Sequence, residues 1–238
     1  MRLFVLLIAH MLADFTLQTN EMANRKKAET KFLLLHCAIY TVVMAVGCFL
    51  CMSIESACGM IAWFGATHLL IDWVRTKFEN KNKDSIKAFG SFVVDQVLHI
   101  GIIFLMCWLL RNEKTSGWPL ESLDEGKLDQ ILRYILLLVT IMDPASVLVK
   151  KLSLMASSKT IDGSVSDENH AGSLIGKLER LVISLLVMNN AYGSIGFVLT
   201  AKSLARHEKL SDPKFAETYL LGTLSSTVIA MVFAKLLG

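Results

Sequence analysis

Long stretches of this sequence lack charged residues. The charges gather in short blocks between apolar runs, and 53% of the 238 residues are hydrophobic. Proline is also scarce, with three residues, and the mean hydropathy is +0.51. A soluble domain of this size would interleave polar residues with a period of about 3.6 or 2. The composition therefore argues against a soluble protein and favours a membrane protein.

The N-terminal apolar run lacks the features of a cleaved signal peptide. His10 and Asp14 interrupt it, and no small-x-small cleavage site follows before the charged stretch. We therefore expect residues 2–17 to be retained as a first helix. The sequence also lacks a second motif to accompany the C-x-x-C of Cys48 and Cys51. This favours small hydrophobic residues in a membrane helix over a redox pair.

Apolar runs long enough to cross about 30 Å of hydrocarbon recur along the chain. The clear runs are residues 32–53, 57–75, 88–110, 128–149 and 216–237. Residues 2–17 and 172–193 form weaker runs, and residues 194–206 form a short helix that is either tilted or re-entrant. The pattern predicts an all-α, polytopic membrane helix bundle with seven or eight transmembrane helices. We expect a first unit at residues 1–110 and a second at 111–238.

Lysine and arginine are unevenly distributed between the loops. Of the 24 basic residues, 17 lie in the stretches 18–32, 74–88, 149–178 and 202–215. Cytoplasmic loops of membrane proteins carry such an excess of positive charge. The distribution therefore predicts that these four stretches are cytoplasmic and that the N-terminus lies outside.

Seven ionisable residues lie in the first four predicted spans. They are His10, Asp14, His36, His68, Asp72, Asp95 and His99. The first and third spans carry His-x3-Asp, which places both residues on one helix face. The fourth span runs in the opposite direction and carries the reverse order, Asp-x3-His. All three pairs therefore place the aspartate nearer the cytoplasm, and the pattern predicts one polar layer.

A polar layer of this kind is costly in a membrane. Ionisable side chains in hydrocarbon cost a few kcal/mol each and usually face a partner or a wet cavity. Histidine and aspartate together are the usual ligands of a divalent cation. We therefore predict that all seven residues contribute to a metal site, with zinc as the expected ion. The favoured direct ligands are His10, His68 and His99 together with one of the three aspartates. Any one of them, and His36 in particular, could instead be a hydrogen-bonded polar group of the bundle. Gln18 and Gln96 flank the pairs as possible hydrogen-bond donors to the ligands.

These motifs carry a family resemblance. The strings His10-Met-Leu-Ala-Asp14, Leu-Leu-His36, His68-Leu-Leu-Ile-Asp72 and Asp95-Gln-Val-Leu-His99 resemble the domain-of-unknown-function family 3307 over roughly residues 1–105. The pattern is also similar in style to bacterial inner-membrane proteins described as metal-dependent hydrolases. The resemblance implies a helical membrane fold, a bacterial inner-membrane location and a metal site. It implies no substrate.

The C-terminal half contains a second group of charged residues at the predicted cytoplasmic ends of its helices. They are Glu179, Arg180, Lys202, Arg206 and Glu217. Because their signs are mixed, they can neutralise one another and lock the helices together. Alternatively, Lys202 and Arg206 form an anion site for a phosphate or a lipid headgroup. The strings around them also resemble a C-terminal extension of longer members of the same family.

Asp143 and Pro144 lie within the predicted span at residues 128–149. Proline frees a backbone carbonyl and kinks a membrane helix. Asp143 could then face a cavity, pair with Arg133 or cap the broken helix.

Three functional classes fit these features. The leading hypothesis is a membrane-embedded, metal-dependent hydrolase, in which the ion lowers the pKa of bound water and Asp14, Asp72 or Asp95 acts as catalytic base. Its substrate would be amphipathic or contain phosphate and would enter from the cytoplasmic leaflet. The alternatives are a transporter or channel for protons or divalent metals, and a non-catalytic membrane partner or sensor. The expected partners are the lipid bilayer and a lipid or phosphate-containing substrate, with no nucleic acid.

Overall fold

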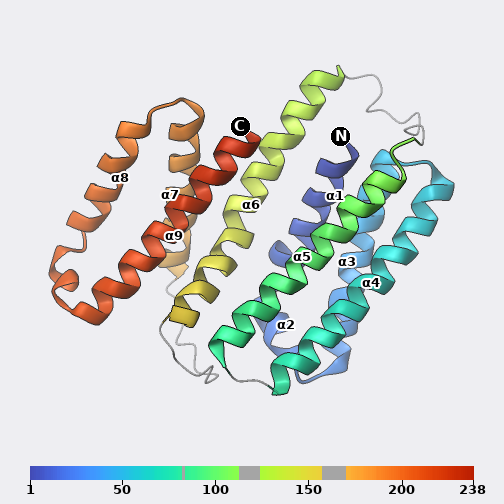
Figure 1. Cartoon of the computed structure of the whole chain (residues 1–238), viewed down its shortest axis with the longest axis horizontal. Helices are drawn as coiled ribbons and strands as arrows, with labels where there is room; N and C mark the ends of the chain where they lie inside the picture. The colour runs from blue at the N-terminus through green and yellow to red at the C-terminus, as the bar shows by residue number, and fades with distance from the viewer. Residues whose placement is uncertain (82–83, 113–123, 157–169) are drawn as a thin grey trace. The chain divides into compact units, whose positions relative to one another are not determined.

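The computed structural model describes residues 1–81, 84–112, 124–156 and 170–238. Within these ranges the chain forms helices and turns and no strand (Figure 1). The elements, in order, are α1 (Arg2–Met11), η1 (Leu12–Thr16), α2 (Asn20–Arg25), α3 (Thr30–Cys51), α4 (Ile54–Lys81), α5 (Ser85–Leu109), α6 (Glu125–Ala156), α7 (His170–Met188), α8 (Tyr192–Leu204), η3 (His207–Ser211) and α9 (Pro213–Leu237). The all-α prediction is confirmed for these residues.

The chain divides into two compact units, Met1–Leu136 and Leu137–Gly238. The division falls within α6, so each unit contains one part of that helix. The predicted limit at residue 110 precedes residues 113–123, which lie outside the described residues, and it stays a prediction.

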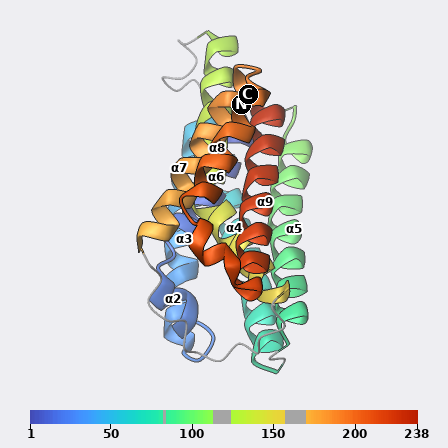
Figure 2. The ribbon, with the colours of Figure 1, turned by 90° about the vertical axis from the view of Figure 1, so that its left-hand side faces the viewer.

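Unit 1 is a ring of four helices. Contacts link α1 to α3, α3 to α4, α4 to α5, and α5 back to α1. The short helix α2 packs against α3 near the turn between α1 and α3 (Figure 2). Glycine permits two close approaches within the ring. A Cβ atom on Gly47 would lie 3.2 Å from the Cβ of Ala9, and one on Gly65 would lie 2.9 Å from Oγ1 of Thr41.

Side-chain caps define where several helices begin. Thr19 accepts a hydrogen bond from the backbone N–H of Met22 at the start of α2, at 3.2 Å. Asp84 caps α5 and Asp212 caps α9 in the same way, through N–H groups two residues further along. Such caps satisfy backbone donors that have no partner inside the helix.

Unit 2 contains the end of α6 together with α7, α8 and α9. Helix α7 contacts both α8 and α9, and η3 packs against α9. Its apolar core contains Leu137, Ile141, Ile183, Val187, Ile195, Ala230 and Ala234. Small residues on α9 let α7 approach closely, which is typical of helix packing in membranes.

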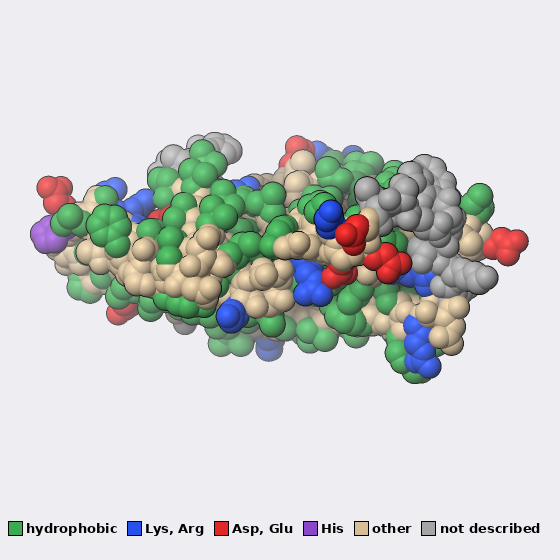
Figure 3. Space-filling view, turned by 90° about the horizontal axis from the view of Figure 1, so that it is seen from above, with side chains coloured by type: hydrophobic (Ala, Val, Ile, Leu, Met, Phe, Trp, Pro, Cys, Tyr) green, Lys and Arg blue, Asp and Glu red, His purple; other side chains and the backbone are tan. Residues whose placement is uncertain are grey.

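Five of the described helices are long and apolar enough to cross a membrane. They are α3, α4, α5, α6 and α9, and they coincide with the five clear apolar runs of the sequence. Many large apolar side chains on these helices point outward, for example Val42, Leu70 and Val97, which are more than 60% exposed. Figure 3 shows apolar side chains over much of the visible surface. An outward apolar surface suits a bilayer, because lipid tails are as apolar as the side chains that face them.

Candidate metal centre

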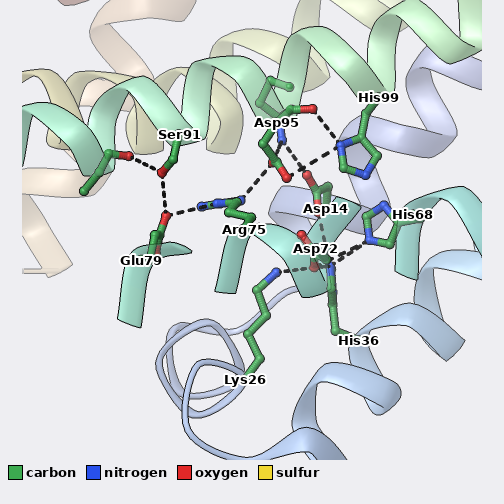
Figure 4. Close-up of polar contacts among 12 residues, drawn as sticks. Asp14, Lys26, His36, His68, Asp72, Arg75, Glu79, Ser91, Asp95 and His99 are labelled. Carbon is green, nitrogen blue, oxygen red and sulfur yellow. Dashed lines mark hydrogen bonds and ion pairs between the residues drawn. The ribbon is translucent and has the colours of Figure 1, made fainter. Parts of the chain in front are cut away.

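All seven histidines and aspartates of the predicted layer lie in unit 1 and are buried. Their exposed fractions range from 0% for His10 and His36 to 6% for Asp14. Figure 4 shows six of them, together with the basic residues around them. They come from α1 and η1, α3, α4 and α5, so every helix of the ring contributes at least one.

The pair on the first helix is separated by a change of helix type. His10 lies in the last turn of α1, whereas Asp14 lies in the π-helical turn η1, where the N–H of Leu17 donates to the carbonyl of Leu12 at 2.9 Å. A π turn contains more residues than an α turn, so the spacing from His10 to Asp14 is not that of a regular α-helix. Both residues contact Gln96, but Asp14 also pairs with His36, whereas His10 stacks on His99.

His36 lies at the centre of the cluster. Its Nε2 atom is 3.1 Å from Nε2 of His68, 3.2 Å from Oδ1 of Asp14 and 3.3 Å from Oδ2 of Asp72. Nε2 of His68 is 3.8 Å from the same oxygen of Asp72. From the sequence alone, His36 was the least certain metal ligand, because its own helix carries no carboxylate. The three other side chains instead reach it from two neighbouring helices.

Lys26 is a member of the cluster that sequence reasoning missed. Its side chain is 6% exposed, and its Nζ donates to Oδ2 of Asp72 at 2.7 Å. The side-chain amide of Gln18 forms two hydrogen bonds in the orientation that gives both its oxygen and its nitrogen a partner. Its oxygen accepts from Nζ of Lys26 at 2.9 Å, and its nitrogen donates to the backbone carbonyl of Asp14 at 3.1 Å. Lys26 belongs to a basic block that predicted a cytoplasmic loop. The excess of buried carboxylates was the signal that a nearby cation was needed.

A second ion-pair network leads from Asp95 toward the end of α4. Arg75 donates to Oδ2 of Asp95 at 2.9 Å and to Oε1 of Glu79 at 3.0 Å. Glu79 also binds Lys27, at 2.9 Å, and accepts a hydrogen bond from Ser91 (Figure 4). Asp95 is thus held by an arginine, unlike Asp14.

Gln96 connects the two halves of the cluster. Its Nε2 donates to Oδ2 of Asp14 at 2.8 Å and to Oδ2 of Asp95 at 3.0 Å. Its Oε1 lies 3.4 Å from Nε2 of His10. The expectation that Gln96 hydrogen-bonds candidate ligands therefore agrees with its position.

Aromatic stacking positions the remaining rings. The ring of Tyr40 lies parallel to that of His68 with centroids 3.6 Å apart, and His99 lies beside His68 at 4.5 Å. His10 stacks on His99 at 5.6 Å. Nδ1 of His99 is held by the backbone carbonyl of Asp95, 2.8 Å away. Tyr40 was not singled out from the sequence, because a tyrosine in an apolar run carries no distinctive signal.

Several buried atoms of the cluster have no hydrogen-bond partner. These atoms are Nδ1 of His10, His36 and His68, Nε2 of His99, and Oδ1 of Asp95. Buried polar groups in folded proteins are almost always paired, and an unpaired one costs about 1–3 kcal/mol. An incomplete polar cluster of this kind has the properties of a ligand site.

Two overlapping sets of these residues can hold a metal ion. Asp14, His36 and His68 form one set, and Cys37, His68 and Asp72 form the other, with ligand atoms within 4.8 Å of one another in each. Neither set contains His10, Asp95 or His99. The ligands favoured from the sequence included His10 and His99, but these two histidines belong to neither of the two sets.

Apolar side chains close the cluster on one side. Leu6, Phe64 and Ile103 lie one helical turn beyond His10, His68 and His99 respectively. They and Met44 are at most 1% exposed. All four lie toward the end of the ring opposite α2, whereas the basic residues Lys26, Lys27 and Arg75 lie toward α2. The cluster is therefore polar on one side only.

The charged residues predicted in the C-terminal half lie in unit 2. Lys202 pairs with Glu179 at 2.5 Å, and Lys177 pairs with Asp143 at 2.5 Å. Arg133 pairs with Asp129, so the suggested pair between Arg133 and Asp143 is wrong.

Arg180 is 3% exposed and donates to the carbonyls of Ile141 and Met142 and to the hydroxyls of Ser146 and Ser226. Arg206 is partly exposed and Glu217 is exposed. The pairing of Lys202 with Glu179 agrees with the packing interpretation, and the anion site stays a prediction.

Residues 2–121 match the model of the family described as protein of unknown function DUF3307. The chain belongs to this family. Searches of curated proteins and of solved structures gave no significant match. In this DUF3307 chain the matched range contains all seven histidines and aspartates of the cluster and ends before α7, α8 and α9. The link between the C-terminal strings and the family therefore stays a prediction.

Proposed function

We propose that this chain is a membrane-embedded, metal-dependent hydrolase whose divalent cation, zinc, is held by Asp14, His36 and His68. One observation carries the proposal. A single ring nitrogen, Nε2 of His36, lies 3.1–3.3 Å from a second imidazole nitrogen and from two carboxylate oxygens. Zinc bonds of about 2.0–2.2 Å in a tetrahedron place ligand atoms about 3.4 Å apart. The spacing of these four atoms suits one ion.

The number of ligands supports a catalytic over a purely structural ion. Catalytic zinc sites use three protein ligands and leave a position for water or substrate, whereas structural sites are closed by four. Asp14, His36 and His68 supply three. The fourth nearby group, Asp72, is held by the ammonium of Lys26.

The chain's own residues divide the remaining tasks. A divalent ion held by Asp14, His36 and His68 would supply a nucleophilic water near neutral pH. Asp72 would be the base, because its Oδ2 is 3.3 Å from Nε2 of the proposed ligand His36. Lys26 orients Asp72, and Gln96 orients Asp14. Asp95 pairs with Arg75 and belongs to neither metal set, which leaves it a weaker candidate for the base.

The side on which the cluster is polar supports entry of substrate from the end near α2. The basic residues Lys26, Lys27 and Arg75 lie there, and a phosphate-containing amphiphile would bring a complementary negative charge. In the proposed topology this end faces the cytoplasm, because the adjoining stretches 18–32 and 74–88 are rich in lysine and arginine.

The proposed topology has seven or eight membrane spans in the bacterial inner membrane, with the N-terminus outside. In addition to the five long apolar helices, α1 with η1 and the helix α7 would cross the bilayer. Support comes from the charge distribution and from ring packing, since α1 lies beside α3 and α5 within unit 1. Helix α8, with 13 residues, would be tilted or re-entrant.

The apolar closure argues against the transporter alternative. A transporter must expose its ion site alternately to both sides of the membrane. Leu6, Phe64 and Ile103 are buried on the side opposite α2 and offer no ligand to a passing ion, and Met44, buried there as well, offers only a thioether sulfur. An enzyme that receives its substrate from one side needs no second path.

Metal analysis of the purified full-length chain tests the proposal. We expect at least one equivalent of zinc in the wild type and a loss of metal from the first position in His36→Ala. The control is His207→Ala, which changes an exposed histidine on η3, outside the cluster. The same preparations in proteoliposomes should hydrolyse a chromogenic phosphoester only when they hold metal.

Absence of stoichiometric metal from the wild type would falsify the metal centre. Metal without turnover, but with uptake of the ion into the vesicles, would overturn the hydrolase and favour a transporter. Equal metal content in His36→Ala and the wild type would show that the ion is bound elsewhere.

A further inference from the structure

We propose that Cys37 contributes a thiolate ligand to a second metal position in unit 1, formed by Cys37, His68 and Asp72. This position would take a thiophilic divalent cation of the zinc class in preference to magnesium. The inference deepens the proposed function and rests on it, because His68 is shared with the proposed hydrolytic centre. An ion in this second position would engage Asp72 as a ligand and so take it from its proposed role as base. Cys37 was not among the metal ligands predicted from the sequence.

The local geometry brings the three groups together. The sulfur of Cys37, a ring nitrogen of His68 and a carboxylate oxygen of Asp72 all lie within 4.8 Å of one another. Cys37 follows His36 on α3 and is therefore turned by about 100° around the helix. His68 and Asp72 are four residues apart on α4, which packs against α3. Cys37 consequently reaches two ligands that already share one helix face.

Burial makes these groups suitable as ligands. Cys37 is 6% exposed, and His68 and Asp72 are each 1% exposed. The thiol is free, so no disulfide occupies the sulfur. Other free cysteines of α3, such as Cys48, are just as buried, but none of them belongs to a described ligand set.

A second observation points independently to a missing ligand. Nδ1 of His68 is buried and has no hydrogen-bond partner, although Nε2 of the same ring faces His36. Nδ1 of His36 is unpartnered as well. In metal sites the ring nitrogen that does not bind the ion almost always has a partner, which fixes the orientation of the ring. The two open nitrogens indicate that the cluster lacks at least one bound group.

The chemistry of the set determines which cations it selects. Thiolate is a soft ligand that zinc and cobalt accept, whereas magnesium requires an octahedron of oxygens. When the ion binds, the S–H bond of Cys37 is replaced by a sulfur–metal bond, and the proton is released to water. No oxidant or reductant takes part. The first set contains no sulfur, so the two positions differ in their spectra.

Cobalt(II) titration of the full-length chain in detergent distinguishes the two positions, because only a thiolate ligand gives a sulfur-to-cobalt charge-transfer band in the near ultraviolet. We expect this band in the wild type. Cys37→Ser should lose the band and still bind cobalt through Asp14, His36 and His68. Asp14→Asn should keep the band, since it changes only the first set. Cys48→Ser is the matched control, buried on the same helix, and should resemble the wild type.

X-ray absorption of the cobalt-loaded wild type needs no variant and should show a sulfur neighbour at about 2.3 Å. Cobalt bound without a band or a sulfur neighbour overturns the Cys37 position and leaves the hydrolytic centre standing. A band that persists in Cys37→Ser overturns it as well. A wild type that binds no cobalt overturns both proposals.

Discussion

The two units of the chain treat buried polar groups in opposite ways. In unit 1, five buried side-chain atoms of the histidine and aspartate cluster have no hydrogen-bond partner. In unit 2, the comparable buried group is the guanidinium of Arg180, and three of its nitrogens donate to described acceptors. Among the described side chains of unit 2, the hydroxyl of Ser184 alone is buried and unpartnered.

The difference separates a structural polar network from a ligand site. Arg180 donates to carbonyls of α6 just before Pro144, where a proline removes a backbone donor and disturbs the helix. Its side chain adds donors to two carbonyls of α6 and joins α6, α7 and α9. The unit 1 cluster remains incomplete and contains groups that bind cations. A network that satisfies itself stabilises the fold, whereas one with open positions can accept a ligand.

The largest expected effect is on metal content in His68→Ala. His68 belongs to both ligand sets, so its removal should reduce bound metal from stoichiometric to background. The circular dichroism of the helices should change little, because unit 2 does not depend on the metal. Elemental analysis beside His207→Ala measures the loss. If His68→Ala retains its metal, the ion does not bind at the histidine and aspartate cluster of unit 1.

The next effect is on stability in Arg180→Ala. This change removes the donor to the carbonyls of Ile141 and Met142 and to the hydroxyls of Ser146 and Ser226, at about 1–3 kcal/mol for each group left unsatisfied. Met142 and Ser146 keep the hydrogen bond between them. We expect a loss of about 3 kcal/mol in the free energy of unfolding, measured by denaturant titration in detergent, with metal content unchanged. Arg133→Ala is the control, because its pair with Asp129 is largely exposed and should be worth less than about 1 kcal/mol. A coupled loss of metal would contradict the separation of the two units.

A third effect should have the opposite sign. Lys26 places a positive charge 2.7 Å from Asp72, beside the proposed ion. Lys26→Met should therefore increase zinc affinity about tenfold, equivalent to about 1.4 kcal/mol, and lower the melting temperature of the metal-free chain. Competition with a chromophoric chelator measures the affinity. Lys27→Met, which loses a pair with Glu79, should leave it unchanged. Weaker binding in Lys26→Met would show that Lys26 supports the ion.

The smallest expected effect tests the ligand set suggested by the sequence pattern. His99 stacks near His68 but belongs to neither metal set. His99→Phe should preserve the stoichiometry and lower zinc affinity by less than about tenfold, since it alters only the packing of a ligand. Isothermal titration with zinc gives both quantities. A complete loss of zinc binding would show that His99 is itself a ligand, which would add one more metal-binding group to unit 1.

Much of the fold could be predicted because it depends on local sequence. The five clear apolar runs coincide with α3, α4, α5, α6 and α9, since their length and composition do not depend on what they pack against. The family could be recognised for the same reason, from motifs within single helices. The π turn at Asp14 could not be predicted from the sequence, because the choice between α and π hydrogen bonding in one turn follows from packing.

The candidate site was predicted as a group, but its internal arrangement was not. His10, His68 and His99 were favoured because each has an aspartate four residues away on its own helix. The observed centre is His36, which has none and obtains its carboxylates from α4 and η1. Helical periodicity predicts which residues share a face of one helix. It does not predict how that helix is rotated against its neighbours.

Composition and periodicity were enough to establish that this chain is helical, that five of its helices have the length and apolarity of membrane spans, and that its first half concentrates buried histidine and aspartate. Tertiary structure alone decided that His36 is central and that Lys26 and Cys37 join the cluster. The physical reason is the short range of these interactions. Hydrogen bonds and metal bonds act over about 2–3 Å, and only the packing of one helix against another brings atoms of distant residues that close.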